Sequence, residues 1–168
     1  MSLDADIACL LRQEERIRFA SFDEADAWRL GCSMRQFALE SGLPLVMEVR
    51  IGERPLFYSA LPGTDAENYQ WVQRKVRTVM RFGKCSYRAG REYRRKRDLT
   101  ITALLKLRKM QYTLAGGSFP IHVTGTGNVG CVTVSGVTQR QDHNFVVESL
   151  CRFLGIEYAP LALPPGEG

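Results

Sequence analysis

Residues 116–143, GGSFPIHVTGTGNVGCVTVSGVTQRQDH, decide how this chain folds. Gly125, Gly127 and Gly130 form a G-x-G-x-x-G motif, which is typical of dinucleotide-binding proteins. In those proteins the last glycine begins a helix whose N-terminus holds the pyrophosphate. Here Gly130 is followed by residues 131–135, CVTVS, whose β-branched alternation indicates a strand. The pattern therefore argues against a dinucleotide site.

The same stretch predicts a β-hairpin. Its strands are expected at residues 119–124 and 129–135, joined by a turn of glycines and an asparagine. Pro120 cannot donate a backbone hydrogen bond, so its strand is expected at an edge of the sheet or near a strand start. A second hairpin is expected around Gly52, where glycine tolerates a positive φ.

Apolar periodicity and capping residues predict the remaining elements. Because strands arrive as hairpins with helices between them, the fold class is α+β, a five-stranded antiparallel sheet flanked by helices. The expected elements are a helix at 3–13, a strand at 14–20, a helix after the N-cap Asp23, strands at 45–51 and 54–60, a helix from the capping box that starts at Thr64, one or two helices within 87–110, and a helix at 139–154.

Composition limits the class of protein. The chain has 168 residues, of which 45% are hydrophobic and 24% charged, as is usual for one globular domain. We expect a single domain over residues 1–158 and a flexible tail over 159–168, where proline and glycine are frequent. No stretch is long and apolar enough to span a membrane. The cysteines are odd in number and never spaced as C-x-x-C, so we expect no disulfide framework and a cytoplasmic location.

Charge is distributed unevenly along the chain. Residues 74–109 hold fourteen of the 23 Lys and Arg residues but only two of the 18 Asp and Glu residues. Such a region suits an anionic ligand, the acidic surface of a partner, or a solvated helix face. Tyr87 and Tyr93 interleave with the basic run, as in single-strand nucleic-acid sites, but no nucleic-acid-binding module surrounds them. We therefore do not expect nucleic acid as the partner.

Several motifs together resemble a known family. GGSFPI, a glycine turn, VSG and the DH before an apolar helix are similar to the haem-degrading domain family, as are three motifs upstream. This resemblance spans residues 10 to 154 and implies a profilin-like α/β/α sandwich, a homo-oligomer, and haem as a candidate ligand. One departure is Ala115, where near relatives often carry histidine. The upstream motifs are QEER near Gln13, LPGT at residues 61–64, and N-x-x-W-x-x-R-K at Asn68, Trp71, Arg74 and Lys75.

The double glycine is the preferred ligand site. Backbone freedom beside a hydroxyl allows a carboxylate or phosphate to approach closely, although a tight turn would explain the glycines equally well. A planar or anionic ligand, such as haem with its propionates, would meet Arg74 or Lys75 there. A solvated face formed by Arg74, Arg77 and Arg81 is the alternative for that helix. The full set of expected ligand-binding residues is Trp71, Arg74, Lys75, Gly116, Gly117, Ser118, Phe119, Pro120, Asp142 and His143.

His143 is the candidate metal ligand. It lies on the apolar stripe of the last helix, near the positive end of the helix dipole, and both features favour the neutral imidazole that binds haem iron. A hydrogen-bonded core histidine is the alternative. Asp142 is interpreted as a helix cap or, less readily, a catalyst. His122 is expected at the surface unless a neighbouring subunit covers it.

The leading hypothesis is a small-ligand-binding protein, and whether the ligand is turned over stays open. No G-x-S-x-G, H-E-x-x-H or P-loop motif is present to indicate a hydrolase or a kinase. The alternative hypothesis is a non-enzymatic oligomeric module that docks a protein partner through the basic residues 74–109.

Overall fold

The computed structural model describes residues 2–96 and 111–163. None of the helices in these ranges is long and apolar enough to cross a membrane. The described elements, in chain order, are α1 (Leu3–Arg16), α2 (Glu24–Glu40), β1 (Val46–Ile51), β2 (Arg54–Ala60), α3 (Ala66–Phe82), α4 (Ser86–Lys96), β3 (Ser118–Val123), β4 (Gly127–Ser135), α6 (Gln139–Leu154) and the short 3₁₀ helix η1 (Ala159–Leu161).

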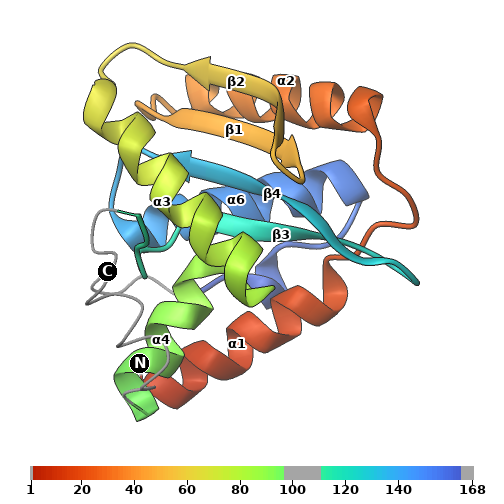
Figure 1. The fold of residues 1–168 in the computed structure, drawn as a ribbon, viewed down its shortest axis with the longest axis vertical. Coiled ribbons are helices and arrows are strands. Elements are labelled where there is room, and N and C mark those ends of the chain that lie inside the picture. Colours follow the sequence, from red (N-terminus) through yellow and green to blue (C-terminus); the bar gives the residue numbers. More distant parts are fainter. Residues whose placement is uncertain (1, 97–110, 164–168) are drawn as a thin grey trace.

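The described strands form one antiparallel sheet in the order β2-β1-β4-β3. Helix α3 crosses one face of the sheet, and α2 and α6 cover the other (Figure 1). Helices α1 and α4 lie side by side next to β3. The expected α+β class and both hairpins are confirmed. The edge position expected from Pro120 is confirmed as well, because β3 is the last strand of the sheet.

The expected fifth strand, residues 14–20, is wrong. Helix α1 continues to Arg16, and beyond it Phe19 makes only an isolated parallel bridge to Val123. Glu14 extends the helix because its carboxylate accepts hydrogen bonds from the Cys85 backbone N–H and from Arg88. In the part of the chain that the structure describes, the sheet therefore has four strands.

Local signals place the helix starts. Asp23 caps α2 as expected, in a reciprocal capping box with Asp26. The cap of α3 is Asp65, one residue later than the Thr64 expected from the sequence, and its box partner is Asn68. Each box satisfies backbone N–H groups that have no partner inside the helix.

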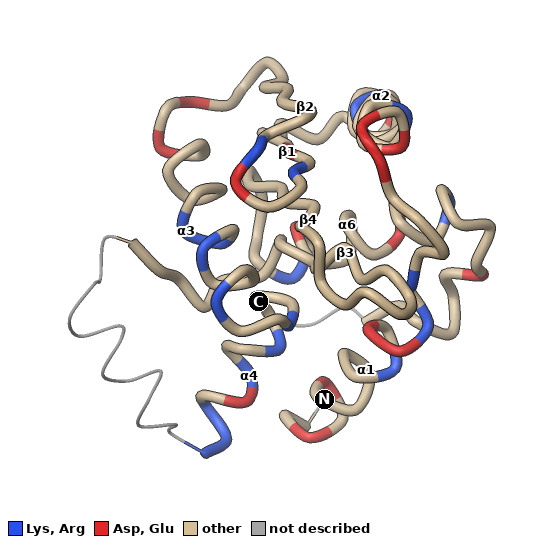
Figure 2. Tube along the Cα trace, turned by 45° about the vertical axis from the view of Figure 1, so that its right-hand side comes forward, with Lys and Arg blue, Asp and Glu red and all other residues tan. Residues whose placement is uncertain are grey.

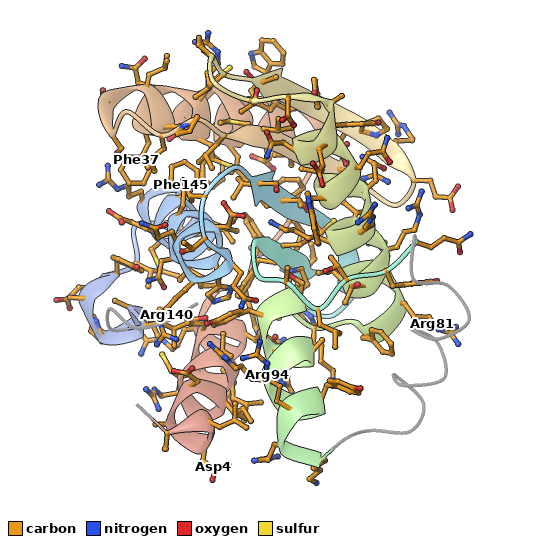
Figure 3. All side chains as sticks on the ribbon, turned by 90° about the vertical axis from the view of Figure 1, so that its left-hand side faces the viewer. Asp4, Phe37, Arg81, Arg94, Arg140 and Phe145 are labelled. Carbon is orange, nitrogen blue, oxygen red and sulfur yellow. The ribbon has the colours of Figure 1, made fainter. Side chains whose placement is uncertain are left out.

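The core is unequal on the two faces of the sheet. The large cluster lies between the sheet and α2 and α6, where Phe37 stacks on Phe145 at 5.0 Å between ring centroids (Figure 3). Alternation along the strands sends every second side chain to the α3 face, as the pleat requires. That face holds a smaller apolar cluster of Val46, Val72, Val76, Val79 and Cys131. The α3 layer is thus the thinner one, and the polar groups described below lie under it.

The chain end is packed further than expected. Leu161 and Leu163 are buried, and Gln13 Nε2 donates a hydrogen bond of 2.7 Å to the Leu161 carbonyl. Asn144 Nδ2 donates to the Leu163 carbonyl at 3.1 Å. Two leucines and two amide side chains thus hold residues 161–163 against α1 and α6, whereas the sequence predicted a flexible tail over residues 159–168. The remaining residues of that tail lie outside the described part.

Of the helices expected within residues 87–110, α4 covers the basic run as far as Lys96. Residues 97–110 lie outside the described residues.

Candidate functional site

Two adjoining pockets lie where α3, α4, residues 113–117 and the start of α6 meet. Their volumes are about 310 and 240 Å³, and Trp71, Ala115 and Gln139 line both. We call the combined hollow the Trp71 slot. The larger pocket is also lined by Tyr87, Gly90, Arg91, Tyr93, Arg94, Thr113 and Leu114, and the smaller by Asn68, Lys75, Ser135, Gly136, Val137 and Asp142.

The slot gathers motifs that are far apart in the sequence. Asn68, Trp71 and Lys75 come from the N-x-x-W-x-x-R-K motif, and Asp142 comes from the DH before α6. The VSG motif contributes its serine and its glycine. Ala115 lines both pockets. The fold therefore brings part of each of these motifs to one hollow.

Gly116 and Gly117 do not themselves line the slot but pack against residues that do, and we call them the wall beneath the slot. Neither position has room for a side chain. A Cβ on Gly116 would lie 2.3 Å from the Gln139 carbonyl oxygen. Gly117 has φ +117°, and a Cβ there would lie 2.6 Å from the Val134 carbonyl oxygen. Close packing explains Gly116, and close packing together with a positive φ explains Gly117.

Ser118, Phe119 and Pro120 do not line the slot, contrary to expectation. All three are buried in β3. Ser118 Oγ lies 2.7 Å from Thr133 Oγ1, and Phe119 is 1% exposed within the large core. Their strand belongs to the interior, because α3, α4 and α6 pack against it.

Lys75 and Asp142 form a buried ion pair in the smaller pocket. Lys75 Nζ lies 2.7 Å from Asp142 Oδ2 and donates a second hydrogen bond of 2.9 Å to the Val134 carbonyl. Burial lowers the pKa of Lys75, an effect that the nearby carboxylate partly offsets. Burial raises the pKa of Asp142, and Lys75 partly offsets that shift. Loss of solvent thus brings the ammonium and the carboxyl closer in proton affinity.

Asp142 is not the cap of α6. Thr138 caps that helix, in a capping box with Gln141. The second carboxylate oxygen of Asp142 accepts the Val137 backbone N–H at 3.2 Å. The cap therefore lies four residues before Asp142, which leaves this carboxylate to face Lys75.

His143 is in the core. It is fully buried, its ring stacks on Tyr87 at 5.1 Å, and its Nε2 lies 2.8 Å from Gln13 Oε1. The Gln13 amide nitrogen is used on the Leu161 carbonyl, so Nε2 must carry the proton. Burial lowers the pKa of His143 from 6.5 to about 3, with a further contribution from Arg140. Burial thus favours the neutral imidazole expected from the sequence.

The iron-ligand role expected for His143 does not fit this structure. Tyr87 lies between the imidazole and the slot, and the histidine is not among the lining residues. Within the described part of the chain, the residues that line the slot include no histidine, cysteine or methionine. Of the known axial ligands of haem iron they offer only tyrosine, at Tyr87 and Tyr93. His122 is half-buried on β3 and does not line the slot either.

Positive charge borders the slot at two points. The Arg74 guanidinium lies 5.0 Å from the centroid of the Trp71 ring, a cation–π contact. Arg94 lines the larger pocket and is exposed, without an ion-pair partner among the residues that the structure describes. Figure 3 places Arg94 on α4 and Arg81 far from it, at the end of α3. The expected contact of Arg74 with a ligand stays a prediction, since it reaches the slot only through Trp71.

Much of the remaining basic charge on α4 is neutralised inside the chain. Arg88 pairs with Glu14 at 2.6 Å and Arg95 with Asp4 at 3.2 Å, so α4 presents basic residues to acidic residues of α1 (Figure 2). Between them a buried cluster joins α1, α4 and α6 beneath the larger pocket. In this cluster Asp6 pairs with Arg140 at 3.0 Å and Arg91 at 3.2 Å, and both arginines donate to the Tyr87 hydroxyl.

Sequence reasoning missed several lining residues. Tyr93 and Arg94 belong to the basic run, but their helix phase could not be assigned to a pocket. Thr113 and Gln139 carry no local signal at all. An alternative hollow of about 320 Å³ lies elsewhere, lined by Glu48, Pro55, Tyr58 and Tyr69, and contains none of the expected site residues.

Solved structures share this fold. The Ybr137w protein superposes with a TM-score of 0.79 at 27% identity, covering 89% of this chain and 87% of that one. HbpS has a TM-score of 0.64 at 15% identity and covers 82% of this chain and 93% of that chain. A PduOC:heme complex has a TM-score of 0.66 at 13% identity, covering 82% of this chain and 97% of that chain.

Curated relatives match over nearly the whole chain. A UPF0303 protein of Acidobacterium capsulatum is 44% identical, covering 98% of this chain and 99% of its own length. A UPF0303 protein of Pseudomonas entomophila is 43% identical, covering 98% of this chain and 91% of its own length. A family model described as haem degrading protein HbpS-like matches residues 22–151. The chain belongs to the HbpS-like family of haem-degrading proteins.

Proposed function

We propose that this protein binds a small planar anion in the Trp71 slot, with haem as the first candidate ligand. The main support for this proposal is that one hollow is lined by residues from segments far apart in the sequence, namely Asn68, Trp71, Lys75, Ala115 and Asp142. The family description and the haem complex of a structural neighbour support haem as the first compound to test.

The lining of the slot suits such a ligand. Trp71 and Tyr93 offer aromatic surface to a flat ring, and Arg94 offers an exposed cation. The N-terminus of α6, at Gln139, carries the positive end of the helix dipole, which favours a carboxylate or a phosphate. The combined hollow is in the size range of small-molecule sites, which runs from roughly 300 to 1,000 Å³.

The lining also predicts how haem would be held. Because the lining residues that the structure describes include no histidine, cysteine or methionine, and the Tyr87 hydroxyl is held by Arg91 and Arg140, we expect ring stacking and contacts to propionates to supply most of the affinity. Metal-free protoporphyrin should therefore bind as tightly as haem. Catalytic turnover is no part of this proposal.

Equilibrium titration tests it. Haem and protoporphyrin IX are titrated separately and followed by absorbance, with the wild-type protein, Arg94→Glu and Ala115→Phe. We expect one saturable site, with affinities for the two porphyrins within about threefold of each other, since a missing iron bond removes the main difference between them. Each variant should raise the dissociation constant of both porphyrins by roughly tenfold or more, which equals a loss of about 1.4 kcal/mol in binding free energy.

Arg35→Glu is the matched control. Arg35 is an exposed arginine of α2, on the face of the sheet opposite α3, so its reversal changes net charge without touching the slot. Binding that Arg35→Glu weakens as much as Arg94→Glu, or no saturable binding at all, would contradict the proposal. Haem binding that depends on iron and is lost in His143→Ala would contradict the mode of binding.

Docking of a protein partner through residues 74–109 stays an alternative prediction. Arg88, Arg91 and Arg95 of that region already pair with acidic residues of α1, which leaves fewer charges for a partner. The predicted homo-oligomer and cytoplasmic location also remain predictions.

A further inference from the structure

We infer that Lys75 forms an imine with an aldehyde or ketone that carries an anionic group and binds in the Trp71 slot. The inference rests on the proposed function, because the same slot holds the carbonyl compound. It goes beyond it, since it assigns covalent chemistry to a side chain at the floor of that slot.

The position of Lys75 carries the inference. Lys75 lines the smaller pocket although its side chain is only 2% exposed, so the residue borders the hollow while its side chain is shielded from bulk water. Gly117 packs closely against the amine, because a Cβ there would lie 2.8 Å from Nζ. Asn68 and Ser135 add polar groups to the same pocket.

Asp142 supplies the proton acceptor that such an amine needs. Its Oδ2 lies 2.7 Å from Lys75 Nζ, which is hydrogen-bonding distance for direct proton transfer. Burial lowers the pKa of the lysine and raises that of the carboxyl, so both shifts favour transfer from ammonium to carboxylate. A desolvated lysine with a depressed pKa is the usual amine nucleophile of proteins.

The reaction balances within this pair. Lys75 gives one proton to Asp142, and its nitrogen lone pair adds to the carbonyl carbon to form a carbinolamine after a proton shift. Asp142 then returns its proton to the departing hydroxyl, which leaves as water. The product is a protonated imine that keeps one positive charge beside the Asp142 carboxylate, so the charge of the buried pair is unchanged.

A Lys75–Asp142 pair with a purely structural role would have the same geometry but would not form an imine. Chemical trapping of the imine distinguishes this alternative from a reactive Lys75. The native protein is incubated with pyridoxal 5′-phosphate, a planar anionic aldehyde, and the imine is reduced with sodium borohydride. Peptide mass spectrometry then measures the label on each lysine of the chain, Lys75, Lys84, Lys96, Lys106 and Lys109.

We expect Lys75 to be labelled roughly tenfold or more faster than Lys84, whose amine pairs with Glu92 at the surface. Asp142→Asn should slow labelling of Lys75, and Lys84→Arg should leave it unchanged. Lys75→Arg keeps the positive charge and should remove this fast label. The wild-type comparison stands without the variants, should any of them fail to fold.

Lys75 labelled no faster than Lys84 and Lys96 in the native protein would overturn the inference. The porphyrin titrations, run on the same samples, keep the two proposals apart. Porphyrin binding without fast labelling of Lys75 removes only the covalent chemistry. Fast labelling without porphyrin binding supports the covalent chemistry and removes only the porphyrin as ligand.

Discussion

Lys75 Nζ and Asp142 Oδ2 lie 2.7 Å apart, and both side chains are 2% exposed. The pair joins α3 to the first turns of α6, two elements that are 67 residues apart at these positions. Because Lys75 also binds the Val134 carbonyl, the two helices are held to β4 at one point. The slot and its ion pair therefore depend on the same contacts.

Replacing Lys75 by Met should lower the free energy of unfolding by about 3–5 kcal/mol, because Asp142 would stay buried without its partner. Urea unfolding measures this loss. Arg54→Ala breaks the exposed pair with Glu24, whose side chains are 68% and 59% exposed, and should cost less than about 1 kcal/mol. Similar losses of unfolding free energy in the two variants would show that the buried pair contributes no more to stability than the exposed one.

His143 should make stability fall in acid. Its folded pKa of about 3 lies below the ordinary 6.5, so below pH 6.5 the unfolded chain binds a proton that the folded chain excludes. The stabilisation is complete above pH 6.5 and is lost toward pH 3, at roughly 1.4 kcal/mol per pH unit. Urea unfolding at pH 7.5 and 4.5 should show about 2–3 kcal/mol less acid destabilisation in His143→Phe than in wild type. Equal pH dependence would contradict the burial of a neutral imidazole.

Gly117→Ala should lower the stability of the protein much more than Gly125→Ala. Both glycines have positive φ, at +117° and +80°, so both changes strain the backbone, by about 1 kcal/mol or more. At Gly125 a Cβ meets nothing within 4 Å, whereas at Gly117 it would meet Val134, Lys75 and Asp142 within 3 Å. Thermal unfolding should place Gly117→Ala well below Gly125→Ala. Equal melting temperatures would show that the neighbours of Gly117 can move to make room for a side chain.

Two acidic residues of α1, Asp6 and Asp4, should differ sharply in how much stability their substitution removes. Asp6 is buried and pairs with Arg91 and Arg140, so Asp6→Asn should cost roughly 3 kcal/mol or more. Asp4 is 77% exposed beside Arg95, and Asp4→Asn should cost less than about 1 kcal/mol. Urea unfolding of the two variants gives the comparison. A small loss for Asp6→Asn would mean that the cluster beneath the larger pocket does not hold α1 to α6.

The fold was largely predictable where signals are local. Hairpins follow from glycine positions and alternation, and helix starts follow from Asp23 and from the 64–68 segment, to within one residue. Residues 14–20 were misassigned because Ile17 and Phe19 do alternate and are buried, at 0% and 3% exposure. Burial on alternate residues does not require strand pairing, and α1 keeps its last turn through a long-range contact of Glu14.

The site was predictable in its motifs but not in its contacts. Trp71, Lys75 and Asp142 were expected at a ligand site and do line one pocket. Their mutual geometry depends on how α3 and α6 pack across the sheet, which no local pattern encodes. The same limit explains His143: its apolar helix face was readable from the sequence, whereas the Tyr87 ring that separates it from the slot comes from a distant helix.

Hydrogen exchange with and without protoporphyrin IX tests the central proposal most directly, because it locates the ligand. The account predicts that saturating protoporphyrin slows exchange in the first half of α3, in residues 113–117 and at the start of α6, and leaves β2 unchanged. Protection confined to the hollow at Tyr58 and Tyr69, or no protection anywhere, would contradict it.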